Sequence, residues 1–153
     1  MIRVIVEKGE PVRFRTHEEG DGLLVMMLGF KGQEAPVGSF ELRPSKVFSG
    51  LWELRDVAIH KDRRGDELED RIWQAALQLV KQRLGKGITP GFSANSAAMN
   101  DLEERMWRSK HATPIPEQEL EEGLREAEQS FPGTHGGKAR KWAAKGLSVR
   151  ELF

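Results

Sequence analysis

The chain has 153 residues and a mass of 17.3 kDa, and its 24 Lys and Arg residues balance its 24 Asp and Glu residues. This length fits one domain, and a chain without a basic excess does not fit wholesale nucleic-acid binding, which depends on neutralising phosphates. Cysteine is absent, which excludes disulfides, thiol catalysis and thiolate metal sites. Tyrosine is absent as well.

The first third of the chain predicts β-strands separated by turns that contain Gly. The apolar or alternating runs that carry this signal are residues 3–7, 12–16, 23–30, 37–43 and 51–60. In the last run, strict alternation would place Glu53 and Arg55 on the same face as Val57 and Ile59.

The character of the sequence changes after residue 65. Apolar residues recur every three or four positions over residues 66–84, which predicts an amphipathic helix that packs against a sheet. Residues 88–92 read as a short strand, and residues 96–110 and 116–129 as two further helices. Because a helix links the strands 51–60 and 88–92, we expect these two strands to be parallel, with a right-handed crossover. The order of elements predicts an α/β fold.

The C-terminal part separates into an acidic helix and a basic tail. Residues 131–137 are rich in Gly and read as a linker, and Lys138–Phe153 is basic and contains Trp142. We predict a domain over residues 1–130, with a linker and tail over residues 131–153. Such a tail suits docking onto the acidic helix, self-association with a neighbouring copy, or contact with a nucleic-acid backbone.

Two absences bear on location and on metals. No run approaches the roughly 20 apolar residues of a membrane span, and the N-terminus lacks the features of a secretory signal, so we predict a cytoplasmic protein without membrane contact. The four histidines show no pairing at metal-ligand spacing, so no metal site is predicted. Trp52, Trp73 and Trp107 are predicted to be core or interface aromatics.

A basic turn before the first helix could bind an anion. The strand 51–60 leads through Arg63, Arg64 and Gly65 into the helix that follows. The first turn of a helix has unpaired N–H groups and the positive end of the helix dipole, so a pyrophosphate could bind there between the arginines. The alternative interpretation is a solvated turn that happens to carry two arginines.

The same turn carries a resemblance to a known family. Val57-x-Ile59-x-x-x-x-Arg64-Gly65, followed by a long amphipathic helix, resembles the acyl-CoA-binding segment of the GNAT N-acetyltransferase superfamily. Residues 88–107 resemble the strand and the Asn-containing helix that come next in that family, and the resemblance covers residues 12–112. It implies a mixed, mostly antiparallel sheet with a V-shaped splay between two parallel strands, flanked by helices.

The resemblance also implies a cofactor site for acetyl-CoA. Main-chain groups of Val57 and Ile59 would hold the pantetheine, and Arg63, Arg64 and Gly65 would take the pyrophosphate. Asn95, in the segment that matches the family's Asn-containing helix, is a further candidate cofactor-binding residue.

Glu53 is the candidate catalytic residue. It lies on the strand before the cofactor turn, where several GNAT enzymes place a carboxylate base, and it would deprotonate the ammonium group of an amine substrate. The alternative is a strand Glu that pairs with Arg55 or with a cross-strand cation.

Two departures from the family pattern motivate a second hypothesis. Glu67 and Glu69 stand where the family favours glycine or another small residue, and Asp66 and Asp70 lie beside them. Charges about 4 Å apart repel by a few kcal/mol at an effective dielectric near 20. The chain also lacks the Tyr that many members use as a general acid. The alternative function is therefore a catalytically degenerate GNAT-fold structural or interaction protein. Because short chains of this kind resemble those of bacteriophages, this alternative includes a phage-particle component or a host-interaction factor, and virion association.

Overall fold

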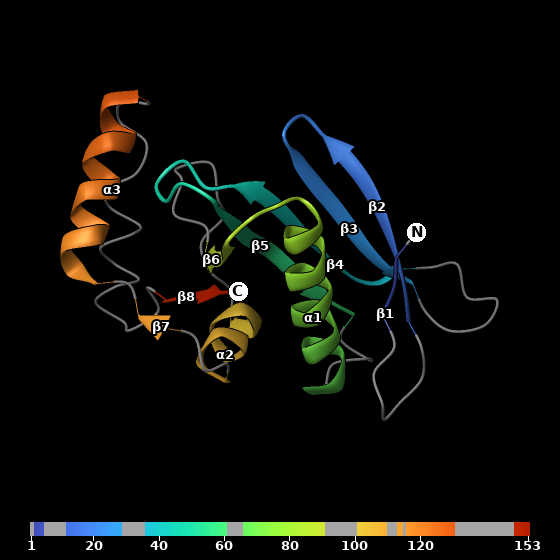
Figure 1. The fold of residues 1–153 in the computed structure, drawn as a ribbon. Helices are drawn as coiled ribbons and strands as arrows, with labels where there is room; N and C mark the ends of the chain where they lie inside the picture. The colour runs from blue at the N-terminus through green and yellow to red at the C-terminus, as the bar shows by residue number, and fades with distance from the viewer. Residues whose placement is uncertain are drawn as a thin grey trace.

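The computed structural model describes residues 2–4, 12–28, 36–60, 66–90, 101–109, 113–114, 116–130 and 149–153 (Figure 1). The strands are β1 (Ile2–Val4), β2 (Val12–Glu19), β3 (Gly22–Leu28), β4 (Pro36–Pro44), β5 (Leu51–Ile59), β6 (Gly87–Pro90), β7 (Thr113–Pro114) and β8 (Val149–Leu152). The helices are α1 (Asp66–Gln82), α2 (Asp101–Ser109) and α3 (Glu117–Ser130). Among the described residues, no helix is both long enough and apolar enough to cross a membrane.

The strands form one mixed sheet in the order β1-β2-β3-β4-β5-β6-β8-β7. Strands β1 to β5 pair with their sequence neighbours in antiparallel fashion, whereas β5 and β6 are parallel. This confirms the predicted class, a mostly antiparallel α/β sheet that contains a parallel pair. The parallel pairing of β5 with β6 runs from Leu51↔Gly87 to Leu54↔Pro90. Beyond Leu54, β5 continues to Ile59 without β6 beside it.

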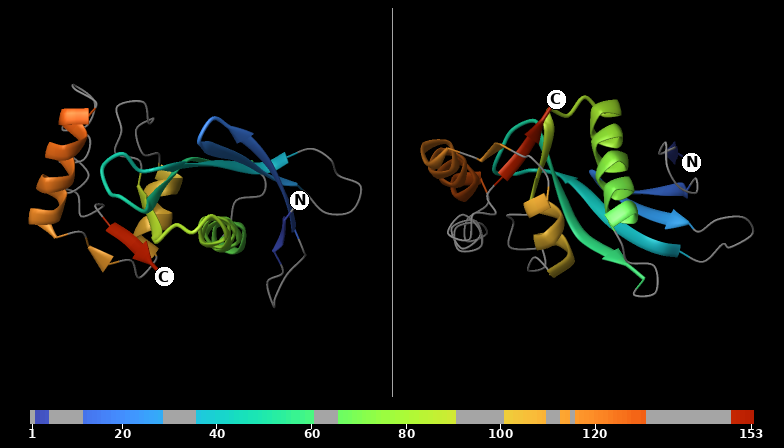
Figure 2. Two further views of the ribbon diagram at one scale, coloured as in Figure 1. Left: turned by 45° about the horizontal axis from the view of Figure 1, so that its top comes forward. Right: turned by 90° about the horizontal axis from the view of Figure 1, so that it is seen from below.

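Helix α1 lies across one face of the sheet, and α2 lies beside it (Figures 1 and 2). The apolar stripe predicted from the sequence is buried, with Ile72, Ala75 and Val80 fully inaccessible to solvent. The ring of Trp73 on α1 meets the ring of Trp107 on α2 edge-on, with centroids 5.0 Å apart. Both rings belong to the main core together with strand residues such as Phe14 and Phe40, as predicted for core aromatics.

The end of the chain enters the sheet. The sequence predicts a tail outside the domain for these residues, but β8 pairs with β6, through Gly87↔Leu152 and Ile88↔Glu151. The Phe153 amide also donates to the Lys86 carbonyl at 3.0 Å. The sequence of such a short polar strand has no hydrophobic pattern that predicts a strand. The strand forms because the open edge of β6 is available for pairing. The rest of the predicted tail, residues 131–148, lies outside the described residues.

Helix α1 ends in a turn that holds a non-glycine residue in a left-handed conformation. Leu84 has φ = 61° and is 92% exposed, and the Gly85 amide donates to the Val80 carbonyl at 2.9 Å. This is one of the two hydrogen bonds that define a Schellman motif, in which the left-handed position usually carries Gly. The following residue, Gly85, provides space, because a Cβ atom there would lie 2.5 Å from Val80 Cγ1.

We therefore expect Leu84→Gly to stabilise the protein by about 0.5–1 kcal/mol, because Gly removes the steric penalty of the left-handed conformation. Urea unfolding monitored by circular dichroism would measure the change. Leu84→Ala is the matched control, since it removes the exposed side chain but keeps Cβ, and it should leave stability nearly unchanged. An equal gain in both variants would contradict the backbone explanation.

Candidate functional site

A β-bulge divides β5 into two halves. The register passes from Ser39↔Ala58 to Glu41↔Arg55, so that Asp56 and Val57 together oppose a single residue of β4. Asp56 has a left-handed φ of 54°, as is common in a bulge. The extra residue reverses the alternation of side chains between the two halves of the strand.

The bulge corrects the predicted arrangement of the site. Leu54, Val57 and Ile59 all pack in the core cluster, so Glu53 and Arg55 lie on the opposite face. The prediction that Glu53 shares a face with Val57 and Ile59 is therefore wrong. The cause is the additional residue, which strict alternation along the sequence does not anticipate.

Glu53 is buried where the pairing of the parallel strands comes to its end. It is 2% exposed, and its register partner on β6 is Thr89, which is fully buried. Within the part of the chain that the structure describes, Thr89 Oγ1 has no hydrogen-bond partner. Paired residues of adjacent strands project to the same face, so the carboxylate and the hydroxyl lie side by side. Arg55 Nη1 lies 3.4 Å from Glu53 Oε1.

Arg55 and Arg43 join Glu53 to a wider group of carboxylates on this face. Arg55 also lies 3.7 Å from Glu41 and 4.0 Å from Asp56. Arg43 contacts Glu41 and lies close to two further acids, Glu19 at 3.7 Å and Asp21 at 3.3 Å. In the ion pairs of this group, two guanidinium groups therefore serve five carboxylates.

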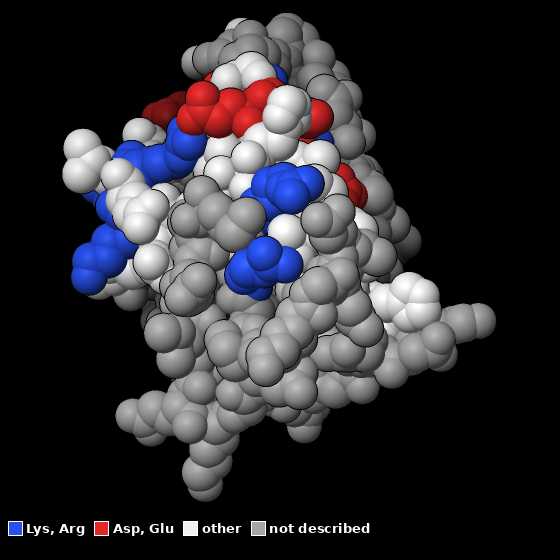
Figure 3. Space-filling model, turned by 90° about the vertical axis from the view of Figure 1, so that its right-hand side faces the viewer, with Lys and Arg blue, Asp and Glu red and all other residues white. Residues whose placement is uncertain are grey.

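The outer end of this group is visible at the surface. Glu18, Glu19 and Asp21 are exposed at the β2–β3 turn. Figure 3 views the molecule from the right-hand side of Figure 1 and shows acidic side chains gathered in its upper part, with Lys and Arg side chains beside and below them. An ion pair in this region joins Arg83 Nη2 to Glu18 Oε1 at 2.5 Å. The zero net charge of the chain is thus the sum of separate charged regions that partly pair with one another.

Within this group, the pKa of Asp56 is raised above its ordinary value of 3.8, chiefly by burial and then by a hydrogen bond and charge repulsion from Glu41. Arg55 and Arg43 oppose that rise. A carboxyl whose pKa is higher in the folded state favours unfolding once it is ionised, so its penalty appears as the pH rises through its titration range.

Asp56→Asn is therefore expected to stabilise the protein at pH 7 and to lose that advantage when the pH falls below about 3, where Asp is protonated in both states. Asn tolerates the left-handed conformation, so the backbone adds no penalty. Thermal unfolding at a series of pH values would measure the difference. The control is Asp21→Asn, which removes a counter-ion of Arg43 and should not stabilise. A gain for Asp56→Asn that persists at pH 3 would contradict the electrostatic cause.

Glu69, one of the four acids near the predicted phosphate turn, pairs with a residue of α2. Glu69 is 4% exposed, and its carboxylate accepts a hydrogen bond from Arg105 Nη2 on α2. Its charge is therefore paired with a guanidinium of α2. The predicted turn itself and the side chains of Asp66 and Glu67 lie outside the described residues.

The predicted cofactor residues fall into two groups. The side chains of Val57 and Ile59 are 1% and 3% exposed in the core. Contact with a ligand would therefore have to involve their main chain, which is the form of contact that the resemblance implies. The predicted anion-binding turn and the candidate on the following helix lie outside the described residues; these are Arg63, Arg64, Gly65 and Asn95. Among the described residues, no group of acids and histidines could hold a metal ion.

Sequence reasoning missed Thr89 and the role of Arg43. The available signal for Thr89 was its place beside Ile88, in a strand predicted to be parallel to residues 51–60. The signal for Arg43 was weaker, because its position beside Gly22 depends on cross-strand register. A Cβ atom on Gly22 would lie 2.7 Å from Arg43 Cγ, so only a glycine leaves space for this side chain.

Comparison with known proteins gives a limited result. No family model matches the chain, and no curated protein matches it in sequence. Among solved structures, it is similar to the crystal structure of an acetyltransferase of the GNAT family from Staphylococcus aureus Mu50, with a TM-score of 0.48 and 13% sequence identity. The aligned part covers 64% of this chain and 57% of that one, so the match spans little more than half of the staphylococcal protein.

Proposed function

We propose that this protein is an acyl-CoA-dependent N-acetyltransferase that transfers an acetyl group to an amine, with Glu53 as the base. The observation that carries the proposal is the buried Glu53 beside the unpartnered hydroxyl of Thr89, where the parallel strands stop pairing. Buried polar groups without partners are rare in proteins, and a ligand that completes their hydrogen bonds is one explanation.

The described residues fit acetyl-CoA at this point of the sheet. The Thr89 hydroxyl supplies a hydrogen-bonding group that no atom of the described residues uses, and the charge of Glu69 is paired with Arg105. Main-chain groups of Val57 and Ile59 would contact the pantetheine. The pyrophosphate would bind at Arg63, Arg64 and Gly65, and Asn95 is the further candidate contact. When bound, acetyl-CoA supplies an acyl group activated as a thioester.

The protein's own residues would prepare the amine. Glu53 would accept a proton from the substrate ammonium, because only the neutral amine is nucleophilic. Arg55 Nη1, at 3.4 Å from the carboxylate, would fix its orientation. Burial of Glu53 keeps bulk water away from the carboxylate, and this strengthens its interaction with a cationic substrate.

A second candidate function is a non-catalytic structural or interaction protein of the same fold. The observation that favours it is the ion pair between Glu53 and Arg55, which also explains a buried carboxylate without any catalytic role. The absence of tyrosine supports it as well. Phage-particle or host-interaction roles, self-association through Lys138–Phe153, and a cytoplasmic or virion location belong with this candidate as untested proposals.

Thermal unfolding with and without acetyl-CoA separates the two candidates. A ligand at 100 times its Kd stabilises the folded state by about 2.7 kcal/mol, which corresponds to a rise in Tm of several degrees for a chain of this length. Desulfo-CoA, which lacks the thioester, and acetate and ATP, which resemble the acyl and nucleotide parts of the ligand, serve as controls. No stabilisation by millimolar acetyl-CoA would contradict the enzyme proposal and favour the non-catalytic one.

Thr89→Val tests the observation on which the proposal depends. Valine has the same shape without the hydroxyl, so the unliganded protein should be at least as stable as the parent, because an unsatisfied buried group is removed. Acetyl-CoA affinity should fall in the same variant. Unchanged affinity would show that the Thr89 hydroxyl does not contact the ligand.

A further inference from the structure

A chain of alternating charges leads from the exposed β2–β3 turn to the buried Glu53. Asp21 lies 3.3 Å from Arg43 Nη1, and Arg43 Nε donates a hydrogen bond to Glu41 Oε1. Arg55 lies 3.7 Å from Glu41 and donates to Glu53 Oε1 at 3.4 Å. Along this ion-pair chain the exposed fraction of the side chains falls from 65% at Asp21 to 29%, 15%, 12% and finally 2%. Its inner contacts are therefore shielded from water, which strengthens them.

One oxygen of Glu41 lies between the two guanidinium groups of the ion-pair chain. Arg43 Nε donates to Glu41 Oε1, and Arg55 Nη2 is 3.7 Å from the same atom, beyond hydrogen-bond distance. Arg55 Nη1 instead reaches Glu53. Since Arg43 occupies the oxygen for which Arg55 would otherwise compete, Arg55 is left to pair with Glu53.

The neighbouring strands provide a built position for Arg43. Its register partner on β5 is Glu53, but its side chain extends over Gly22 of β3, where a Cβ atom would lie 2.7 Å from Arg43 Cγ and 3.0 Å from Nη1. Nη1 also donates to the Glu19 carbonyl oxygen at 3.3 Å. The pKa of Arg43 is raised, chiefly by its hydrogen bond to Glu41. Arg43 therefore stays charged beside Glu41 throughout the range in which carboxyl groups titrate.

We propose that Arg43 is a positioning residue for Glu53, because by holding Glu41 it keeps the Arg55 guanidinium on the Glu53 carboxylate. Without Arg43, the cation that the described ion pairs leave to Glu41 is Arg55, which would then be shared between two carboxylates. Ionised Glu53 would lose part of its stabilisation, so it would hold its proton to higher pH. The consequence for catalysis rests on the proposed function, whereas the pairing is a property of the unliganded protein.

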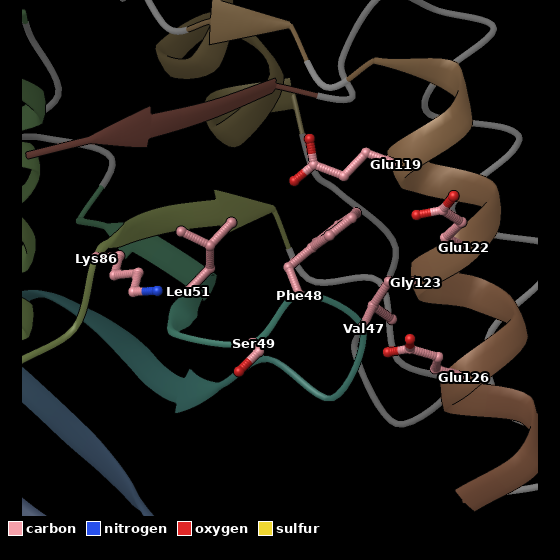
Figure 4. A pocket seen from close by; sticks show the side chains of 9 residues that line it. All are labelled: Val47, Phe48, Ser49, Leu51, Lys86, Glu119, Glu122, Gly123 and Glu126. Atoms are coloured by element: carbon pink, nitrogen blue, oxygen red, sulfur yellow. The ribbon is translucent and has the colours of Figure 1, made fainter.

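The variants that test this proposal leave the other groups around Glu53 unchanged. Among the described residues, β6 contributes the uncharged Thr89 beside Glu53, and β5 contributes Asp56, 4.0 Å from Arg55. The same face of β2, two strands away from β4, carries Arg15, His17 and Glu19. The pocket shown in Figure 4 lies between α3 and the loop that joins β4 to β5, and no residue of the ion-pair chain lines it. A difference between variants therefore reports on the changed residue alone.

NMR titration of the full unliganded chain tests the proposal, with a carbon-13 label in the Glu carboxyl groups and Glu53→Gln used to assign the Glu53 signal. We expect the titration of Glu53 to move to higher pH by about 0.3–0.7 unit in Arg43→Gln, the size expected for a partly solvated charge pair. Glu41→Gln should move it to lower pH, because Arg55 then serves Glu53 without that competitor. No shift in Arg43→Gln would overturn the proposal.

Combining Glu41→Gln with Arg43→Gln separates positioning from a direct effect of charge. If Arg43 acts through Glu41, replacing Arg43 in the Glu41→Gln protein should move the titration of Glu53 by less than about 0.2 unit. The double variant removes one charge of each sign, so its net charge equals that of the parent. Equal shifts in the two backgrounds would show that Arg43 acts directly by its charge, and the proposal would be wrong.

Arg83→Gln is the matched control, because it makes the same change of charge outside the ion-pair chain. The Arg83 side chain is 36% exposed, against 29% for Arg43, and it pairs with Glu18. The titration of Glu53 should stay within about 0.2 unit of the parent in this variant. A shift as large as that of Arg43→Gln would reveal a general charge effect and contradict the positioning role.

Steady-state kinetics gives a second readout, which depends on the proposed function. The acid limb of kcat/KM for the amine reports the base of the free enzyme, and in Arg43→Gln it should move to higher pH by the same amount as the NMR titration. KM for acetyl-CoA should stay within about twofold of the parent. A parent protein without turnover would refute the proposed function but not the pairing, which the NMR titration tests. Turnover with an unmoved acid limb would overturn the positioning role and leave the proposed function intact.

Discussion

Replacing Glu53 by Gln is expected to lower kcat by about 10²–10⁴-fold, the usual contribution of a general base, while acetyl-CoA affinity stays close to that of the parent. Gln has the same size, and Arg55 keeps two carboxylate neighbours, Glu41 at 3.7 Å and Asp56 at 4.0 Å. The fold should therefore survive the change. Steady-state kinetics with a panel of amines, together with acetyl-CoA titration by thermal shift, would measure both quantities.

Glu41→Gln is the matched control for this variant. Glu41 contacts the same Arg55 and lies on the neighbouring strand, but it is not the register partner of Thr89. Its replacement should change kcat by less than about tenfold if it acts only through the charge of the network. Equal losses in the two variants would indicate that the charge network, and not a base at Glu53, determines the rate.

Replacing Trp107 by Ala is expected to lower the free energy of unfolding by about 3–5 kcal/mol, the usual range for a large aromatic residue in a core. Trp107 is 2% exposed and meets Trp73 edge-on at 5.0 Å. This contact joins α2 to α1, so its loss should also loosen the pairing of Arg105 with Glu69. Urea unfolding followed by circular dichroism gives the change in free energy.

Trp107→Phe makes this prediction more specific. The indole Nε1 of Trp107 is buried without a hydrogen-bond partner among the described residues, so Phe removes an unsatisfied donor and keeps an aromatic ring against Trp73. We expect a loss of less than half of that caused by Ala, because no hydrogen bond is given up. A loss as large as that of Ala would imply that the indole nitrogen does have a partner in solution.

Periodicity alone predicted most of the secondary structure correctly. The helix over residues 66–84 corresponds to α1, and the acidic helix over residues 116–129 corresponds to α3. The parallel relation of β5 and β6 followed from the helix between them and the handedness of crossovers. These features depend on spacing along the chain and on local sterics, and both can be read without knowledge of distant contacts.

The candidate site was predicted less completely. Glu53 was identified from a resemblance, but its face was assigned wrongly because a single bulged residue at Asp56 reverses the alternation. Thr89 and Arg43 join the site through cross-strand register, which depends on partners that are distant in sequence. The partner of Glu69 could not be predicted for the same reason, since Arg105 reaches Glu69 only when α2 packs beside α1.

The sequence by itself determined the neutral sum of charges, the lack of cysteine and tyrosine, the α/β order of elements and the amphipathic faces of the helices. The tertiary structure decided which charges meet, which polar groups are buried without partners, and where the last strand pairs. The physical reason is that amphipathicity and chain reversal arise from neighbours within a few residues, whereas burial, register and ion pairing depend on contacts between segments that the sequence leaves far apart.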